Sequence, residues 1–174
     1  SADAVVAILA VLKTGAAYVP IDPGVPVARI ELTLADARPV AVITTTDLAE
    51  RLHGFDVLVI DIEYPELHDQ PSTTVAQPDS ADIAYLIYTS GTTSRPKGVA
   101  IPHRNVTGMI GVPPAGLVSA QVWTQCHSYA FDFSVWEIWA ALLGGGRLVV
   151  VPEVVAASPH DFHALLVAEQ VDVL

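Results

Sequence analysis

The stretch DIAYLIYTSGTTSRPKGVAIP, residues 82–102, joins an apolar run to a loop that is rich in hydroxyl groups. Residues 82–90 alternate and are rich in β-forming side chains, so they predict a strand. A short second strand is predicted after the loop, over residues 98–102, and a helix is expected to begin near His103. The loop therefore lies at the carboxyl end of the first strand, which is where open α/β sheets bind ligands.

The loop has the composition of a phosphate-binding segment. Glycine leaves backbone N–H groups accessible, the hydroxyl groups donate hydrogen bonds, and Lys97 adds a positive charge. It is not a Walker A loop, because no glycine directly precedes the lysine and no serine or threonine follows it. A Ser/Thr-rich surface turn accounts for the same composition, which leaves both interpretations open. The candidate phosphate-binding residues are Thr89, Ser90, Gly91, Thr92, Thr93, Ser94 and Lys97.

Helical and strand patterns alternate along the rest of the chain. Continuous Val, Ile and Leu runs predict fully buried strands, and glycines and prolines mark the ends of helices, Pro113 and Pro114 among them. This order predicts an α/β fold with a mostly parallel sheet flanked by helices. The predicted helices cover residues 2–14, 28–37, 46–54, 133–146 and 158–170, and the further strands cover 39–45, 56–61, 121–130, 147–152 and 171–174. Residues 16–26 are expected to be extended, with Tyr18 and Asp22 holding them against the sheet, and residues 62–80 form a polar surface linker.

The acidic composition argues against negatively charged partners. With 8 Lys and Arg against 19 Asp and Glu, the formal net charge is −11, so the chain repels nucleic acids and anionic membranes. A hydrophobic content of 52% in 174 residues is enough for one compact core. The single cysteine, Cys126, forms no internal disulfide, and no Cys/His spacing predicts a metal site. A reducing, cytoplasmic setting is therefore expected.

A carboxylate interrupts an apolar stretch at Asp132. Phe131 and Phe133 flank it, and Trp136 follows three residues after Phe133, so the side chains at 133 and 136 are neighbours on a helix face. Burying a lone carboxylate costs free energy, so Asp132 is expected either to cap the predicted helix or to pair with a cation. His127, a little earlier, is expected to be a hydrogen-bonded histidine on a strand.

Three stretches together resemble the acyl-adenylate-forming (AMP-binding) superfamily. YTSGTTSRPKG (88–98) is similar to its phosphate-binding signature. LKTGAAYVPIDPGVP (12–26) and FDFSVWEIWAALLGGGRLVVVP (131–152) resemble the motifs before and after that signature in adenylation domains of nonribosomal peptide synthetases. The resemblance implies ATP-dependent activation of an amino acid as an aminoacyl adenylate, followed by loading onto the phosphopantetheine thiol of a carrier protein.

The resemblance also implies roles for single residues. The loop and Lys97 would offset charge as pyrophosphate leaves, and Phe131 matches an aromatic residue that gates the active site. Asp132 would pair with the α-ammonium group of the amino acid, while Phe133 and Trp136 would form walls of its pocket. A selectivity pattern that starts with Asp, Phe and Trp is similar to that of threonine-activating domains.

The resemblance predicts that residues 1–174 are part of an adenylation domain truncated at both ends. Most Mg²⁺ ligands and the adenine pocket are then expected outside this chain, and other synthetase modules are expected partners. Ser94 stands where the family usually has glycine, which predicts weakened phosphate contact. Two alternatives stay open: a catalytically incomplete remnant that binds phosphate or acts as an interaction module, and a piece of an acyl-CoA ligase, which an exposed Asp132 would favour.

Overall fold

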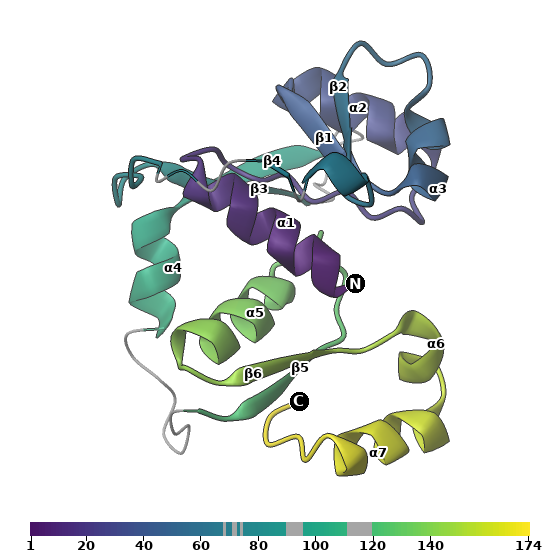
Figure 1. Cartoon of the computed structure of the whole chain (residues 1–174), viewed down its shortest axis with the longest axis vertical. Helices are drawn as coiled ribbons and strands as arrows, with labels where there is room; N and C mark the ends of the chain where they lie inside the picture. The colour runs from purple at the N-terminus through teal and green to yellow at the C-terminus, as the bar shows by residue number, and fades with distance from the viewer. Residues whose placement is uncertain (68, 71–72, 74, 90–95, 111–119) are drawn as a thin grey trace.

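The computed structural model of the chain describes residues 1–67, 69–70, 73, 75–89, 96–110 and 120–174 (Figure 1). Among these residues the strands form three two-stranded sheets. β1 (Ala41–Thr44) and β2 (Leu58–Asp61) are parallel, as are β5 (Val122–Gln125) and β6 (Arg147–Val150), whereas β3 (Ile83–Thr89) and β4 (Lys97–Pro102) are antiparallel. Strands and helices alternate along the chain, and the predicted α/β class is confirmed.

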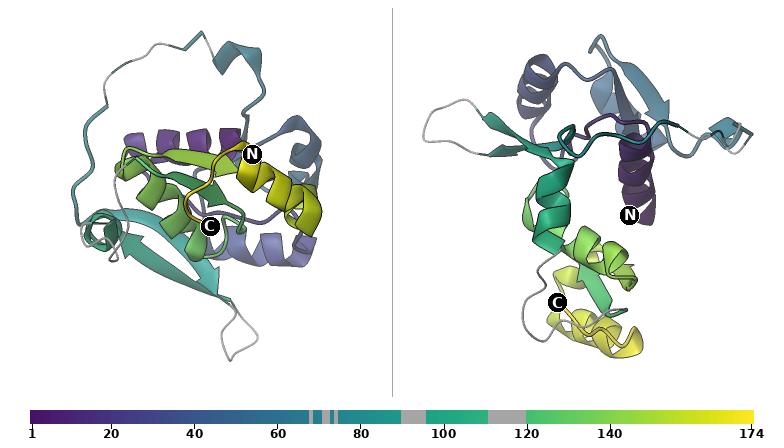
Figure 2. Two further views of the ribbon diagram at one scale, coloured as in Figure 1. Left: turned by 90° about the horizontal axis from the view of Figure 1, so that it is seen from below. Right: turned by 90° about the vertical axis from the view of Figure 1, so that its left-hand side faces the viewer.

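The antiparallel pairing of β3 with β4 differs from the parallel arrangement expected for most strands. Residues 90–96 separate the two strands. Parallel strands need a crossover of about a dozen residues or more, whereas a short connection joins antiparallel strands. In both views of Figure 2 one end of the hairpin projects beyond the helices, while the rest of β3 packs in the core. The hydroxyl-rich stretch still follows the carboxyl end of β3, as predicted.

The predicted helices form, with ends that shift by a few residues. Ser1 caps the first helix by accepting a hydrogen bond from the Ala4 N–H, and Ser158 caps the last one by accepting from the Asp161 N–H, with Pro159 in its first turn. The helices are α1 (Ala2–Lys13), α2 (Val27–Ala37), α3 (Thr46–Ala49), α4 (His103–Ile110), α5 (Phe133–Leu143), α6 (Glu153–Ala156) and α7 (Pro159–Ala168). The 3₁₀ helices η1 (Glu50–Leu52) and η2 (Pro65–Leu67) add single turns, and the short α6 was not predicted. Pro113 and Pro114 lie outside the described residues.

The main core lies between α1, β3, α4 and α5, which are neighbours in Figure 1. α5 is the most deeply buried helix, and Ile138 and Ala141 on it are almost fully enclosed. The buried apolar side chains of this core are Val5, Ile8, Tyr18, Ala84, Tyr85, Ile87, Val106, Val135, Ile138 and Trp139. This packing holds the N-terminal end of α5 in place against the rest of the chain.

The extended segment that follows α1 lies along β3. The Tyr18 N–H donates to the Ala84 carbonyl at 3.1 Å, and the Leu86 N–H donates to the Tyr18 carbonyl at 2.9 Å. The ring of Tyr18 packs against that of Tyr85 with centroids 5.5 Å apart. Tyr18 therefore holds this segment against a strand, as predicted.

A second, smaller core lies under β1 and β2. Ile30 and Leu34 of α2 and Leu52 of η1 are buried there, and Val42 of β1 packs against them. The predicted full burial of these strands is wrong: Leu58 is 64% exposed. In the described structure, a two-stranded sheet packed on α2 leaves apolar side chains exposed, although the sequence pattern suggested helices on both faces.

The region between β2 and β3 contains η2 and no other helix or strand among its described residues, most of which are exposed. None of the described helices has the length and the apolar character needed to span a bilayer.

Candidate functional site

The β3–β4 hairpin brings Thr89 and Lys97 opposite each other. They are paired in register at the end of the hairpin that adjoins residues 90–96, and both are exposed. An exposed hydroxyl and an exposed ammonium group at one edge fit an anionic ligand. Ser90, Gly91, Thr92, Thr93 and Ser94 lie outside the described residues, so their role remains a prediction.

Tyr88 and Gly98 form the next pair along the hairpin. A β-carbon on Gly98 would lie 3.0 Å from the ring of Tyr88, so the ring lies across the glycine. The Tyr88 hydroxyl donates a 2.6 Å hydrogen bond to the Asp36 carboxylate and so ties the hairpin to α2. Burial, followed by the hydrogen bond and the charge of Asp36, raises the pKa of Tyr88 to about 12.

Asp132 stands directly before α5, at the helix N-cap position. Its side chain makes no capping hydrogen bond and is exposed, so both the expected capping and the expected burial are wrong. The carboxylate is close enough to act on Tyr85, whose pKa is raised by burial and then further by the charge of Asp132. Asp132 thus presents a negative charge at the surface, next to the exposed first residue of α5, Phe133.

The predicted pocket aromatics divide between two sets of partners. The rings of Phe131 and Phe133 both lie near His127, with centroid separations of 5.8 Å and 4.9 Å. Trp136 instead packs nearly edge-on against Trp123 of β5, with centroids 5.8 Å apart. Phe131 and Phe133 are 54% and 44% exposed. The structure therefore gathers Phe131, Asp132 and Phe133 at one exposed place and directs Trp136 toward the β5 strand.

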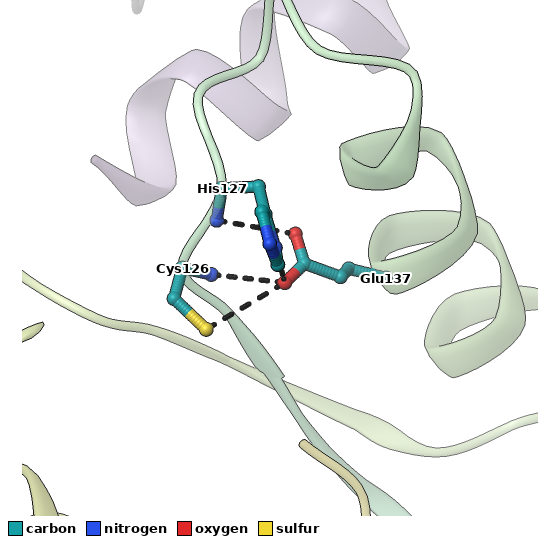
Figure 3. Close-up of side chains that lie close together, drawn as sticks. All are labelled: Cys126, His127 and Glu137. Atoms are coloured by element: carbon teal, nitrogen blue, oxygen red, sulfur yellow. Dashed lines mark hydrogen bonds and ion pairs between the residues drawn. The ribbon is translucent and has the colours of Figure 1, made fainter.

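A buried carboxylate organises the residues that follow β5 (Figure 3). Glu137 is 2% exposed, and its Oε1 lies 2.8 Å from His127 Nδ1. The same oxygen accepts from the Cys126 N–H at 3.2 Å and the Cys126 thiol at 3.6 Å, and Oε2 accepts from the His127 N–H at 3.4 Å. Burial is the main cause that raises the pKa of the Cys126 thiol, so the thiol form is favoured.

Cys126, His127 and Glu137 are also of the types that bind zinc, and their ligand atoms lie within 4.8 Å of one another. Both carboxylate oxygens of Glu137, however, already accept hydrogen bonds from N–H groups. The carboxylate is satisfied within the chain, and a structural role in holding the loop explains the cluster.

A hydrogen bond connects the loop before α5 to the segment after α1. The Ser128 hydroxyl donates to the Asp22 carboxylate at 2.6 Å, and Asp22 also accepts from the Gly24 N–H at 2.8 Å. An open hollow of about 280 Å³ lies beside them, lined by residues that include Asp22, Arg29, Tyr88 and Phe131. The hollow thus brings the segment after α1, the end of β3 and the loop before α5 to one place.

The family model described as "AMP-binding enzyme" matches residues 1–174. The chain belongs to the AMP-binding enzyme family. Among the relatives of this AMP-binding enzyme is the isonitrile lipopeptide synthase of Mycobacterium tuberculosis (strain ATCC 25618 / H37Rv), 60% identical over 173 residues, which are 99% of this chain and 7% of that protein. The dimodular nonribosomal peptide synthase of Bacillus subtilis (strain 168) is 46% identical over 187 residues, covering 100% of this chain and 8% of that protein.

The fold of this AMP-binding enzyme matches a crystal structure of the nonribosomal peptide synthetase FmoA3. The TM-score is 0.84 at 26% identity, with 98% of this chain and 18% of that chain covered. The resemblance to nonribosomal peptide synthetase adenylation domains is therefore confirmed. The chain spans less than a tenth of the length of the two curated relatives named above.

Glu137 was not identified from the sequence as the residue that holds Cys126 and His127 in this AMP-binding enzyme. It lies within an apolar helix, ten residues after the histidine that it contacts. The signal was present, because a charged residue in the middle of a buried helix needs partners. His127 was expected to be hydrogen-bonded, and it is, but it lies just beyond the end of β5.

Proposed function

We propose that this chain is part of an enzyme that activates an amino acid as an aminoacyl adenylate and loads it onto the phosphopantetheine thiol of a carrier protein. The observation that carries this proposal is the match of almost the whole chain to peptide synthases, with 60% identity over 173 residues to one of them. The exposed group Phe131, Asp132 and Phe133 at the start of α5 supports it, because a carboxylate beside aromatic rings suits an ammonium group attached to an apolar body.

Lys97 and Thr89 are proposed to contact the terminal phosphates of ATP. Bound ATP supplies the α-phosphate that the carboxylate of the amino acid attacks, and pyrophosphate leaves. The ammonium group of Lys97 would offset charge on the departing phosphates, and the hydroxyl of Thr89 would donate a hydrogen bond to them. Ser90, Gly91, Thr92, Thr93 and Ser94 are proposed to complete this contact.

Asp132 is proposed to hold the α-ammonium group of the amino acid. Phe131 would gate the site, and Phe133 and Trp136 would line the side-chain pocket, with threonine as the first substrate to test. Trp136 packs against Trp123, so it can line the side-chain pocket only if that pocket extends to the contact between the two rings. We propose that Mg²⁺ is held mostly by residues outside this chain, which is itself a partial adenylation domain, and that other synthetase modules are partners. A reducing cytoplasmic setting suits both the free thiol of Cys126 and the thiol of a carrier.

The exposure of Asp132 is the feature that was expected to favour an acyl-CoA ligase. The named relatives are peptide synthases, so amino acids remain the proposed substrates. A remnant without catalytic activity is the other alternative, and one assay separates all three.

The test is amino-acid-dependent exchange between ATP and labelled pyrophosphate, in the full-length protein as its gene encodes it. The panel holds the proteinogenic amino acids and a series of fatty acids. Exchange with one or a few amino acids, lost in Asp132→Ala, supports the proposal. Exchange with fatty acids alone supports an acyl-CoA ligase, and no exchange with any acid refutes the proposed activity.

A further inference from the structure

We propose that Glu137 and His127 are positioning residues that set which amino acid the site accepts. This inference rests on the proposed function, which it deepens by naming residues that do not themselves contact the substrate. Their action would pass through Phe131 and Phe133, the two exposed rings on either side of Asp132.

The first step is the fixed place of the Glu137 carboxylate. It projects from α5, whose neighbouring residues Ile138 and Ala141 lie in the core, and it is 2% exposed. Both of its oxygens accept hydrogen bonds from backbone N–H groups, one from Cys126 and one from His127, so the side chain is held at two points. A buried carboxylate of this kind holds residues 126 and 127 at a set distance from the helix axis.

The second step is the orientation of the His127 ring. Its Nδ1 lies 2.8 Å from Glu137 Oε1, which fixes the ring plane relative to α5. The histidine side chain is nevertheless 45% exposed. The core does not enclose it, so its position depends on the bond to Glu137 rather than on general packing.

The third step is the contact between this ring and the two phenylalanines. Centroid separations of 4.9 Å to Phe133 and 5.8 Å to Phe131 lie in the range of favourable aromatic pairs. Phe131 and Phe133 are each about half exposed, so the histidine ring is a main constraint on where they lie. A chain of contacts therefore runs from the buried side chain of Glu137 through the His127 ring to the rings beside Asp132.

The experiment compares two variants in the full-length protein, with exchange between ATP and pyrophosphate as the readout. His127→Asn keeps a donor near the place of Nδ1 but removes the ring, and Glu137→Gln keeps the side-chain shape but leaves one N–H group facing an amide nitrogen. We expect each to raise KM for the preferred amino acid by roughly three- to tenfold, which is the effect of losing about one aromatic contact. KM for ATP and the kcat of the exchange are expected to stay close to wild type, while discrimination against larger amino acids falls.

Two further variants make the result specific. His127→Phe returns a ring but not the nitrogen that bonds to Glu137, so discrimination is expected to stay as low as in His127→Asn, and full recovery would overturn the role of Glu137. His160→Asn is the matched control, since His160 also lies beside a carboxylate, that of Asp161, but on the exposed helix α7. It is expected to leave every kinetic constant unchanged.

A second measurement does not depend on activity. Hydrogen exchange should speed up in Glu137→Gln at one of the amides of residues 126 and 127, because each donates to a different oxygen of the carboxylate and glutamine keeps only one of them. Unchanged amino-acid selectivity in both Glu137→Gln and His127→Asn would overturn the inference. So would a parallel rise in KM for ATP together with a lower melting temperature, since that pattern reports general loss of structure. If the wild type exchanges with no amino acid, the proposed function fails and the selectivity role fails with it, whereas unaltered hydrogen exchange refutes the positioning role alone.

Discussion

The turn between α5 and β6 contains three glycines in succession, and at Gly145 and Gly146 a larger residue is disfavoured for two different structural reasons. A β-carbon on Gly146 would lie 2.2 Å from the backbone carbonyl oxygen of Gln121. At Gly145 it would meet nothing within 4 Å, but the residue has a φ of +71°. Gly146→Ala is therefore expected to destabilise the fold because of a close backbone approach, and Gly145→Ala because of its left-handed backbone alone.

The two costs differ in size. Ordinary contact begins at 3.4 Å, so Gly146→Ala forces the β-carbon and the Gln121 oxygen apart by about 1.2 Å. That oxygen accepts the Arg147 N–H at 3.0 Å, which is the hydrogen bond at the start of the β5–β6 pair. Strain of about 2 kcal/mol and a lost hydrogen bond of about 1 kcal/mol predict a loss of about 3 kcal/mol. Gly145→Ala should lose about 1 kcal/mol, the cost of a left-handed alanine.

Native-state hydrogen exchange in the full-length protein measures both losses locally. For peptides that cover β5 and β6, these energies correspond to roughly 100-fold faster exchange in Gly146→Ala and roughly fivefold in Gly145→Ala. Protection of α2, which belongs to the other core, should not change in either variant. Equal protection of β6 in the two variants would refute the reasoning, because it would mean that the carbonyl of Gln121 does not limit the turn.

Three further outcomes are expected. Lys97→Gln should slow amino-acid-dependent exchange by about tenfold or more, since one charge that faces the leaving phosphates is lost, and an unchanged rate would remove the hairpin end from the mechanism. Tyr88 should ionise near pH 12 rather than 10.0, because burial and Asp36 favour the neutral phenol. The neutral phenol therefore stabilises the folded state fully below pH 10.0, and this contribution is lost as the pH rises toward 12. An ultraviolet difference titration against Tyr88→Phe locates that step. Glu137→Ala should destabilise the fold by about 3 kcal/mol because it leaves buried N–H donors without an acceptor, while the exposed Glu153→Ala should change stability by less than about 0.5 kcal/mol, and equal melting temperatures would contradict this.

Most elements could be predicted because their signals are local. Ser158 followed by Pro159 marks the start of α7 through hydrogen-bond capping and a fixed φ, and both effects operate within one turn. The exposure of Leu58 could not be predicted in this way, since a Val, Ile and Leu run is the same in a strand covered on one face or on two. Burial depends on which other elements pack against the strand, and that is a property of the tertiary structure.

The candidate site shows the same division. Its three motifs could be located from the sequence, and Thr89 and Lys97 do meet across the hairpin. The contacts of Trp136 and the exposure of Asp132 could not be read from spacing, because a helical period places side chains relative to the helix axis and not relative to a neighbouring strand.

The long-range hydrogen bonds explain why motifs so far apart in sequence can form one site. Ser128 and Asp22 are separated by 106 residues, and Tyr88 and Asp36 by 52, yet each pair is joined by a 2.6 Å bond at the exposed ends of buried elements. Such bonds contribute only about 1 kcal/mol each, too little to bring the segments together against chain entropy. The core of α1, β3 and α5 must therefore set the distances, and the polar pairs then select one arrangement of the loops. The positions of the Phe131 and Phe133 rings depend on the position of α5, because Phe133 begins that helix and Phe131 lies just before it. Core substitutions in α5 should therefore alter substrate recognition even where the substituted residue does not contact the substrate.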